Sequence, residues 1–209
     1  PGVEAVLTAE DIPGENKVGH IKHDQYTLIP VGGLVHYLGD AIALIAAKDE
    51  EALEKAKKLV KVDYEILEPI RSPFAAMQPD APTVFDEEGT NLQAIRSIHR
   101  GDAEGAIARS KYVLSRHFET PEFRQRLQNG ETLDDILPEC CVSYIDKDGD
   151  VHLLTADQSA HTTQRECALL LGTDHIKVEN QLVGGGFGGK EDMSVQHHAA
   201  LITYTTGLP

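Results

Sequence analysis

The sequence predicts a mixed α/β fold, α+β in the broader classification, because short apolar runs alternate with stretches of helical periodicity. Three observations carry this prediction. An apolar run at 41–47 precedes a helical pattern at 50–60, and a second run at 151–156 precedes another at 161–171. A third run at 176–183 leads into a glycine-rich loop. Two strand-helix-strand units are therefore expected, without a true repeat in the sequence.

The first unit is predicted from capping and periodicity. Apolar residues recur at helical spacing from Ala52 to Val60, Asp49 is placed to cap the helix, and acidic residues precede lysines along it. The alternating segment 60–67 predicts a half-buried strand, so residues 40–66 should fold as strand, helix and strand. The proline-rich passage 68–90 excludes a long regular element and marks a domain boundary.

The second unit is predicted in the same way. Residues 151–156 form a strand, 161–171 a helix that Gly172 ends, and 176–183 the strand that enters the glycine loop. A further helix is expected over 191–207. Two sets of residues compete for its inward face: Val195, Ala199 and Ile202, or Met193, Gln196, Ala200 and Tyr204.

Composition excludes several classes of partner. The 209 residues are 41% hydrophobic, enough for a core, and carry a net charge of −15, which disfavours nucleic acid and anionic membranes. No apolar run has the roughly 20 residues of a membrane helix, and the first residues lack signal-peptide features. Three cysteines without a CxxC pair fit a reducing, cytoplasmic location. The start reads as a cut inside a domain.

The loop at 184–189 contains five glycines, and two familiar mechanisms do not account for it. As a phosphate-binding loop it has Glu191 where a Ser or Thr should follow Lys190. As a dinucleotide fingerprint it needs an acidic residue about 20 positions on, beyond Pro209, and Glu191 would repel a pyrophosphate. A plain turn remains the alternative. Phe187 between glycines instead favours a planar or bulky ligand held against the backbone.

The loop GGGFGGKE, together with TADQSAHTTQRECALLLG upstream, resembles the molybdenum-binding subunit of the xanthine dehydrogenase and aldehyde oxidase family. GVEAVLTAEDIPG and the segment from His36 to Pro69 are similar to that family's α/β hammerhead domain. Some stretches most resemble its bacterial, selenium-dependent branch. The resemblance implies a hammerhead domain at 1–75, a linker at 76–100 and the N-terminal part of a molybdopterin-binding domain at 101–209.

The resemblance also assigns residues by position. Gln158 would hydrogen-bond an oxygen ligand of the molybdenum, and Glu191 would orient the substrate. No direct metal ligand is expected. The alternatives are that Gln158 caps the next helix and that Glu191 is a first-turn residue favoured by the helix dipole. The remaining cofactor-binding residues implied are those of the loop: Gly185, Gly186, Phe187 and Gly188.

The implied activity is oxidative hydroxylation of a small purine, aldehyde or N-heterocycle. The cofactor would be molybdopterin, in the simple or the cytosine dinucleotide form, with iron–sulfur clusters and FAD on partner domains or subunits. The family's general-base Glu lies in a GxxE stretch downstream of Pro209, so no catalytic residue is expected here. The chain would be an inactive fragment that needs the C-terminal remainder. The alternative is a non-catalytic acidic α/β interaction domain.

The atypical segment 122–139 departs from the family pattern. Residues from Phe123 to Glu139 resemble the N-terminal part of the bacterial preprotein translocase ATPase, whose other motifs are absent. The segment is either foreign or an ordinary amphipathic stretch, with a helix before Gly130 and a helical turn capped by Thr132 after it.

Other polar residues support no site. Lys190 is expected on a solvated face, paired with Glu191 or Asp192. The histidine pairs at 20/23 and 197/198 lack a third ligand at a suitable spacing, so a metal site is not expected. The three cysteines are interpreted as small core residues.

Overall fold

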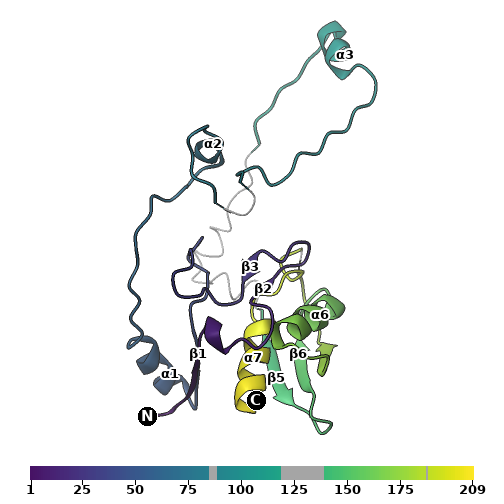
Figure 1. The fold of residues 1–209 in the computed structure, drawn as a ribbon. Coiled ribbons are helices and arrows are strands. Elements are labelled where there is room, and N and C mark those ends of the chain that lie inside the picture. The colour runs from purple at the N-terminus through teal and green to yellow at the C-terminus, as the bar shows by residue number, and fades with distance from the viewer. Residues whose placement is uncertain (85–88, 119–138, 187) are drawn as a thin grey trace. The chain divides into compact units, whose positions relative to one another are not determined.

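The structure is a computed structural model that describes residues 1–84, 89–118, 139–186 and 188–209 (Figure 1). The chain divides into two compact units, one made of 1–62 with 125–209 and the other of 63–124. The atypical segment 122–139, except for its last residue, lies outside the described residues. None of the described helices combines the length and apolar character that a membrane span requires.

A three-stranded sheet forms the centre of the first unit, in the order β5 (Cys141–Ile145), β6 (Val151–Thr155) and β7 (Ile176–Asn180). β5 and β6 form an antiparallel hairpin, whereas β6 and β7 run parallel and are joined by helix α6 (Ala160–Leu171). Gly172 ends α6 with a φ of 63°. The predicted second strand-helix-strand unit is therefore confirmed.

The N-terminal segment packs onto the same unit. β1 (Val3–Leu7) pairs antiparallel with β4 (Leu44–Ala47), and β2 (Lys17–Val18) pairs with β3 (Gln25–Tyr26). A short 3-10 turn, η1 (Ala9–Asp11), follows β1. Helix α1 (Glu50–Lys57) begins as predicted, because the Asp49 carboxylate accepts the Ala52 N–H at 2.8 Å.

One apolar core joins the two parts of this unit. α6 and the last helix, α7 (Gln196–Thr206), pack on the sheet, and α7 also contacts β1 and β4 (Figure 1). Thus residues from both ends of the chain share a single core. This core holds the N-terminal segment against the part of the chain that carries the glycine loop. The fully buried members include Leu28, Leu153, Cys167, Leu170 and Leu201, and Leu7 is nearly fully buried.

The predicted strand at 60–67 is wrong, since this segment has no regular structure. A strand needs a neighbour for its backbone groups, and among the described strands neither β1 nor β4 pairs with this segment. Side chains such as Tyr64 and Ile66 are exposed, so apolar burial does not hold the segment either. Residues 40–66 therefore form one strand, β4, and one helix, α1, and β4 pairs antiparallel with β1.

The last helix begins at Gln196, five residues later than the sequence pattern suggests. The Gln196 side chain accepts the backbone N–H groups of Ser194 and Val195, each at 3.1 Å, and so occupies the donors at the helix start. Neither predicted inward face is reproduced in full. The buried residues are Gln196, His197, Ala200, Leu201 and Thr203.

An ion cluster ties the β5–β6 turn to β7. The Lys177 Nζ donates to Asp146, Asp148 and Asp150 at 2.7, 3.1 and 2.9 Å. Hydrogen bonding to Lys177 lowers the pKa of Asp146 to about 2, and it also lowers that of Asp150. The three carboxylates therefore share one cation from the same sheet, which offsets part of their negative charge.

The second unit contains two short helices, α2 (Pro73–Ala76) and α3 (Ala103–Arg109), capped by Ser72 and Asp102. Asn91 organises the stretch between them: its Nδ2 donates to the carbonyls of Ala76 and Pro82, both at 2.9 Å. No described residue of this unit belongs to the buried hydrophobic set.

Candidate functional site

Gln158 and the glycine loop meet where the parallel strands β6 and β7 end. The Gln158 backbone N–H donates to the Lys190 carbonyl at 2.8 Å, and the Gln181 N–H donates to the Thr155 carbonyl at 2.8 Å. Carboxyl ends of parallel strands lie at one edge of a sheet, where open α/β units gather ligands. Gln158 and the segment that carries Glu191 therefore lie together at this edge of the sheet.

The Gln158 side chain lies across the loop. Its Oε1 accepts the Gly188 N–H at 3.1 Å, and a Cβ on Gly186 would collide with the same side chain. Because a backbone N–H only donates, this bond fixes which end of the amide is the oxygen. No described residue accepts from Nε2, and Gln158 is exposed, so two N–H donors remain available.

A buried aspartate holds Gln158 in place. Asp157, 2% exposed, accepts the Thr163 hydroxyl at 2.7 Å and the Ser159 N–H at 3.0 Å, while its carbonyl accepts from Asn180 at 3.1 Å. These bonds connect the end of β6 to α6 and to β7. The Gln158 backbone is therefore positioned from two elements at once.

The helix-capping alternatives do not hold. Asp157, and not Gln158, binds the first turn of α6, while the Gln158 side chain points to Gly188. Glu191 precedes the first residue of α7 by five positions, outside the helix's first turn. Neither residue is thus explained by a helix terminus.

The loop itself turns at Gly188, whose φ of 85° is in the left-handed region, as the glycine run predicts. Gly186 has a different reason, since the Gln158 side chain occupies the space that its Cβ would need. Open space lies beside Gly184 and Gly188. Phe187 lies outside the described residues.

The prediction for Lys190 is wrong, because its side chain is only 6% exposed and so does not lie on a solvated face. Its charge acts instead on Glu139, just before β5. Burial raises the pKa of the Glu139 carboxyl, and Lys190 acts in the opposite direction. The loop residue after Gly189 is therefore directed inward.

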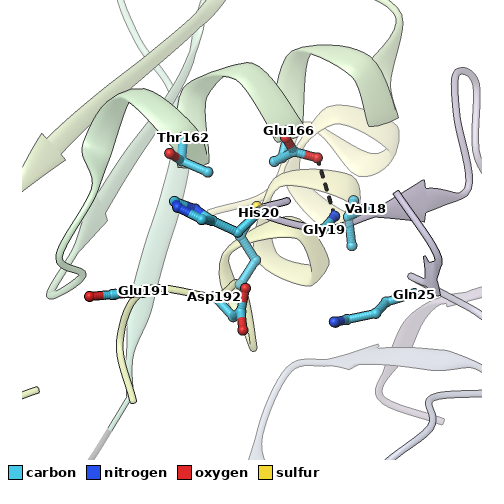
Figure 2. A pocket seen from close by; sticks show the side chains of 9 residues that line it. Val18, Gly19, His20, Gln25, Thr162, Glu166, Glu191 and Asp192 are labelled. Atoms are coloured by element: carbon cyan, nitrogen blue, oxygen red, sulfur yellow. Dashed lines mark hydrogen bonds between the residues drawn. The ribbon is translucent and has the colours of Figure 1, made fainter. Parts of the chain in front are cut away.

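A shallow surface pocket lies beside Glu191 (Figure 2). Glu191 and Asp192 line one side, and His20 and Gln25 from the β2–β3 segment line another. The remaining lining residues are Val18, Gly19, Thr162, Glu166 and Met193.

Glu166 is the buried charge of this region. Its side chain is 1% exposed and accepts two N–H groups of Arg165 at 3.0 and 2.9 Å. It also accepts the Gly19 N–H at 3.4 Å and lies 3.3 Å from His23 Nε2. A buried carboxylate requires such partners, and these join α6 to the N-terminal segment.

Thiol and histidine chemistry is not favoured. Burial raises the pKa of Cys141 to about 12 and raises that of the fully buried Cys167 as well. His197 is buried, and burial lowers its pKa well below the ordinary value. Within the described ranges, no group of three His, Cys, Asp or Glu residues is placed to hold a metal ion.

Sequence reasoning missed Asp157, Glu166 and His20. Glu166 could have been found, because it falls between Thr163 and Leu170 on the stripe that α6 buries, where a charge needs a partner. His20 could not, since only the tertiary fold brings the β2–β3 segment to Glu191.

Two family models match the chain. The molybdopterin cofactor-binding domain spans residues 84–209, and the a/b hammerhead domain of aldehyde oxidase and xanthine dehydrogenase spans residues 1–68. The chain is 33% identical to the nicotinate dehydrogenase large molybdopterin subunit of Eubacterium barkeri and 32% identical to a probable xanthine dehydrogenase subunit of Bacillus subtilis. Each match covers 100% of this chain, but only 47% and 27% of the two relatives.

Solved structures give the same result for the fold. The aldehyde oxidoreductase of Desulfovibrio desulfuricans has a TM-score of 0.77 over 99% of this chain and 23% of its own, at 22% identity. The CO dehydrogenase of Oligotropha carboxidovorans has a TM-score of 0.72 over 100% of this chain and 27% of its own, at 26% identity. The expected hammerhead and molybdopterin-binding architecture is confirmed, and the chain belongs to the xanthine dehydrogenase and aldehyde oxidase family of molybdenum-binding subunits.

Proposed function

We propose that this chain forms one side of the molybdopterin site of a molybdenum hydroxylase and carries part of its substrate pocket. The observation that carries the proposal is the Gln158 side chain, fixed over the glycine loop by Gly188 with its Nε2 donors directed to no described residue. An interaction domain without a cofactor would have no need of an amide held in this way.

The residues present fit the cofactor. The exposed backbone at Gly184 and Gly188 has open space where side chains would stand, which allows a bulky group to approach the chain. Gln158 would donate through Nε2 to an oxygen of the cofactor without altering its charge. Gly185, Gly186 and Phe187 complete the segment proposed to border it.

Glu191 is proposed to bind the substrate. It is exposed, lines the pocket, and follows directly the residue whose carbonyl accepts the Gln158 N–H. A carboxylate at this place would accept an N–H of a heterocycle and so orient its ring. Gln158 would then contact the cofactor and Glu191 the substrate, and the hydrogen bond from the Gln158 N–H to the Lys190 carbonyl would hold the two residues together.

The bound cofactor would supply the redox chemistry of an oxidative hydroxylation. This chain would bind and orient, and the proton-accepting Glu would come from polypeptide beyond Pro209. Iron–sulfur and FAD partners would take the electrons. The nicotinate and xanthine dehydrogenases among the relatives favour an N-heterocycle as substrate.

Hydrogen exchange of the complete subunit tests the cofactor assignment. The subunit is purified once with molybdopterin and once from cells that cannot make it. We expect the cofactor to slow exchange of backbone amides at 156–159 and 184–191, while β4 and α1 at 44–57 exchange at the same rate in both samples. Equal exchange at 156–159 and 184–191 would contradict the proposal.

A further inference from the structure

The backbone is held on both sides of Gln158, and Asp157 takes part in both attachments. The Asp157 carbonyl accepts a hydrogen bond from Asn180 Nδ2 at 3.1 Å. The N–H of the same peptide group, that of Gln158, donates to the Lys190 carbonyl at 2.8 Å. The next peptide group is held by the Asp157 side chain, whose Oδ1 accepts the Ser159 N–H at 3.0 Å. Both peptide planes that meet at the Gln158 Cα are therefore fixed, and with them the direction of its Cα–Cβ bond.

The Asp157 side chain is in turn anchored to the first turn of α6. Its Oδ2 accepts the Thr163 hydroxyl at 2.7 Å, so each carboxylate oxygen has one described donor. Asp157 and Thr163 are each 2% exposed, and a hydrogen bond that is shielded from water is stronger than an exposed one. The start of α6 therefore sets where the Gln158 side chain begins.

A helix start alone does not explain a carboxylate at this place. Asn or Ser caps a helix about as well as Asp does, without the cost of a buried charge. The two described partners of the carboxylate, an N–H and a hydroxyl, are both neutral. An ionised carboxylate differs from an amide because it only accepts, so it can bind both donors whichever way the group is turned.

The Gln158 amide carries this anchorage to the exposed loop. Its Oε1 accepts the Gly188 N–H at 3.1 Å, and its side chain fills the space that a Cβ on Gly186 would need. A continuous set of bonds thus runs from the buried Thr163 through Asp157 and Gln158 to the loop.

We propose that Asp157 is a positioning residue that acts through Gln158. Anchored by Thr163, it holds the Gln158 amide over the glycine loop, so that Nε2 keeps one place relative to Gly188. Asp157 itself is buried and touches neither cofactor nor substrate. This inference rests on the proposed function, which assigns the cofactor contact to Gln158.

Exchange of the Gly188 amide hydrogen, measured by nuclear magnetic resonance in the labelled 209-residue chain without cofactor, tests the proposal. Gln158→Ala should speed this exchange about 3- to 10-fold, the effect of one lost hydrogen bond. Asp157→Ala should speed it by a similar factor, and the double variant should be no faster than Gln158→Ala alone. None of these substitutions changes the sequence neighbours of Gly188, so its intrinsic exchange rate stays the same.

Conservative variants separate positioning from a general loss of stability. Thr163→Val keeps the shape of the side chain, removes the bond to Asp157, and should also speed exchange at Gly188. Asp157→Asn should lie closer to the unaltered chain than Asp157→Ala does, because an amide can accept from Ser159 and donate to Thr163. Thr162→Val is the matched control, since its hydroxyl bonds Ser159 Oγ at 2.8 Å, and it should leave the Gly188 rate unchanged.

An unchanged Gly188 rate in Asp157→Ala and in Thr163→Val would overturn the proposal, as would a double variant that exchanges faster than Gln158→Ala. Should Asp157→Ala fail to fold, Thr163→Val decides alone. In the complete subunit, Asp157→Ala should lower turnover beside Gln158 and have no further effect beside Gln158→Ala. The cofactor test reads protection of 156–159 by molybdopterin. If that protection is absent while Gly188 responds as expected, the molybdopterin assignment fails and the positioning by Asp157 stands.

Discussion

The effect of Gly186→Ala on stability should depend on whether Gln158 is present. The φ of Gly186 lies outside the left-handed region, so the backbone accepts Ala, but the added Cβ would collide with the Gln158 side chain. Gln158 must then rotate and give up its bond to the Gly188 N–H. The substitution therefore acts through a second side chain.

The magnitude follows from two opposing effects. Loss of the Gln158–Gly188 bond costs about 0.5–1.5 kcal/mol, whereas Gly to Ala at a compatible position gains about 0.4–1 kcal/mol from the unfolded chain. In the Gln158→Ala background only the gain remains. The effect of Gly186→Ala should thus be less favourable with Gln158 than without it, by about 1 kcal/mol.

Urea unfolding, followed by circular dichroism, measures this difference. The four chains compared are the unaltered chain, Gly186→Ala, Gln158→Ala and the double variant. Gly184→Ala is the matched control, because nothing lies within 4 Å of its added Cβ and it should behave alike in both backgrounds. An effect of Gly186→Ala that is the same with and without Gln158 would refute the reasoning.

Three further substitutions have defined outcomes. Asp49→Ala removes the cap of α1 and should lower the free energy of unfolding by about 1 kcal/mol in urea, with loss of helix signal. Glu166→Gln removes the negative charge that pairs with Arg165 and should lower the free energy of unfolding by about 2 kcal/mol. An unchanged free energy of unfolding would contradict the role of Glu166 in joining α6 to the N-terminal segment. Burial, and to a smaller extent the neighbouring His198, lowers the pKa of His197 in the folded chain. As the pH falls, the unfolded chain is therefore protonated at His197 before the folded chain is. Stability should therefore fall as pH drops below about 6.5, and less steeply in His197→Asn, as measured by urea unfolding at several pH values.

Local chemistry made much of the fold predictable. Features that depend only on neighbouring residues were predicted correctly. They are the Asp49 cap of α1, the left-handed Gly172 at the end of α6, and the strands β6 and β7. The strand prediction for 60–67 failed because this segment has no partner strand in the described chain. The presence of a partner strand cannot be read from the local sequence pattern.

The site was predictable only in its loops. Gln158 and the glycine run are close in space because parallel strands end together, and the strand pattern already implied this. Lys190 was placed wrongly, because its burial depends on the tertiary fold, which also brings its charge close enough to act on Glu139, far away in the sequence. His20 comes from another part of the chain, so only the shared core brings it to Glu191.

Steady-state kinetics of the complete subunit with its redox partners tests the division of roles most directly. The measured quantity is kcat/KM for two different heterocycles in the unaltered enzyme, Gln158→Ala and Glu191→Ala. Gln158→Ala should lower both values by a similar factor, because its lost hydrogen bond goes to the cofactor. Glu191→Ala should change their ratio by the equivalent of roughly 1.5–3 kcal/mol, the strength of a charge-assisted hydrogen bond to the substrate. If both variants keep the unaltered values and ratio, neither residue belongs to the site.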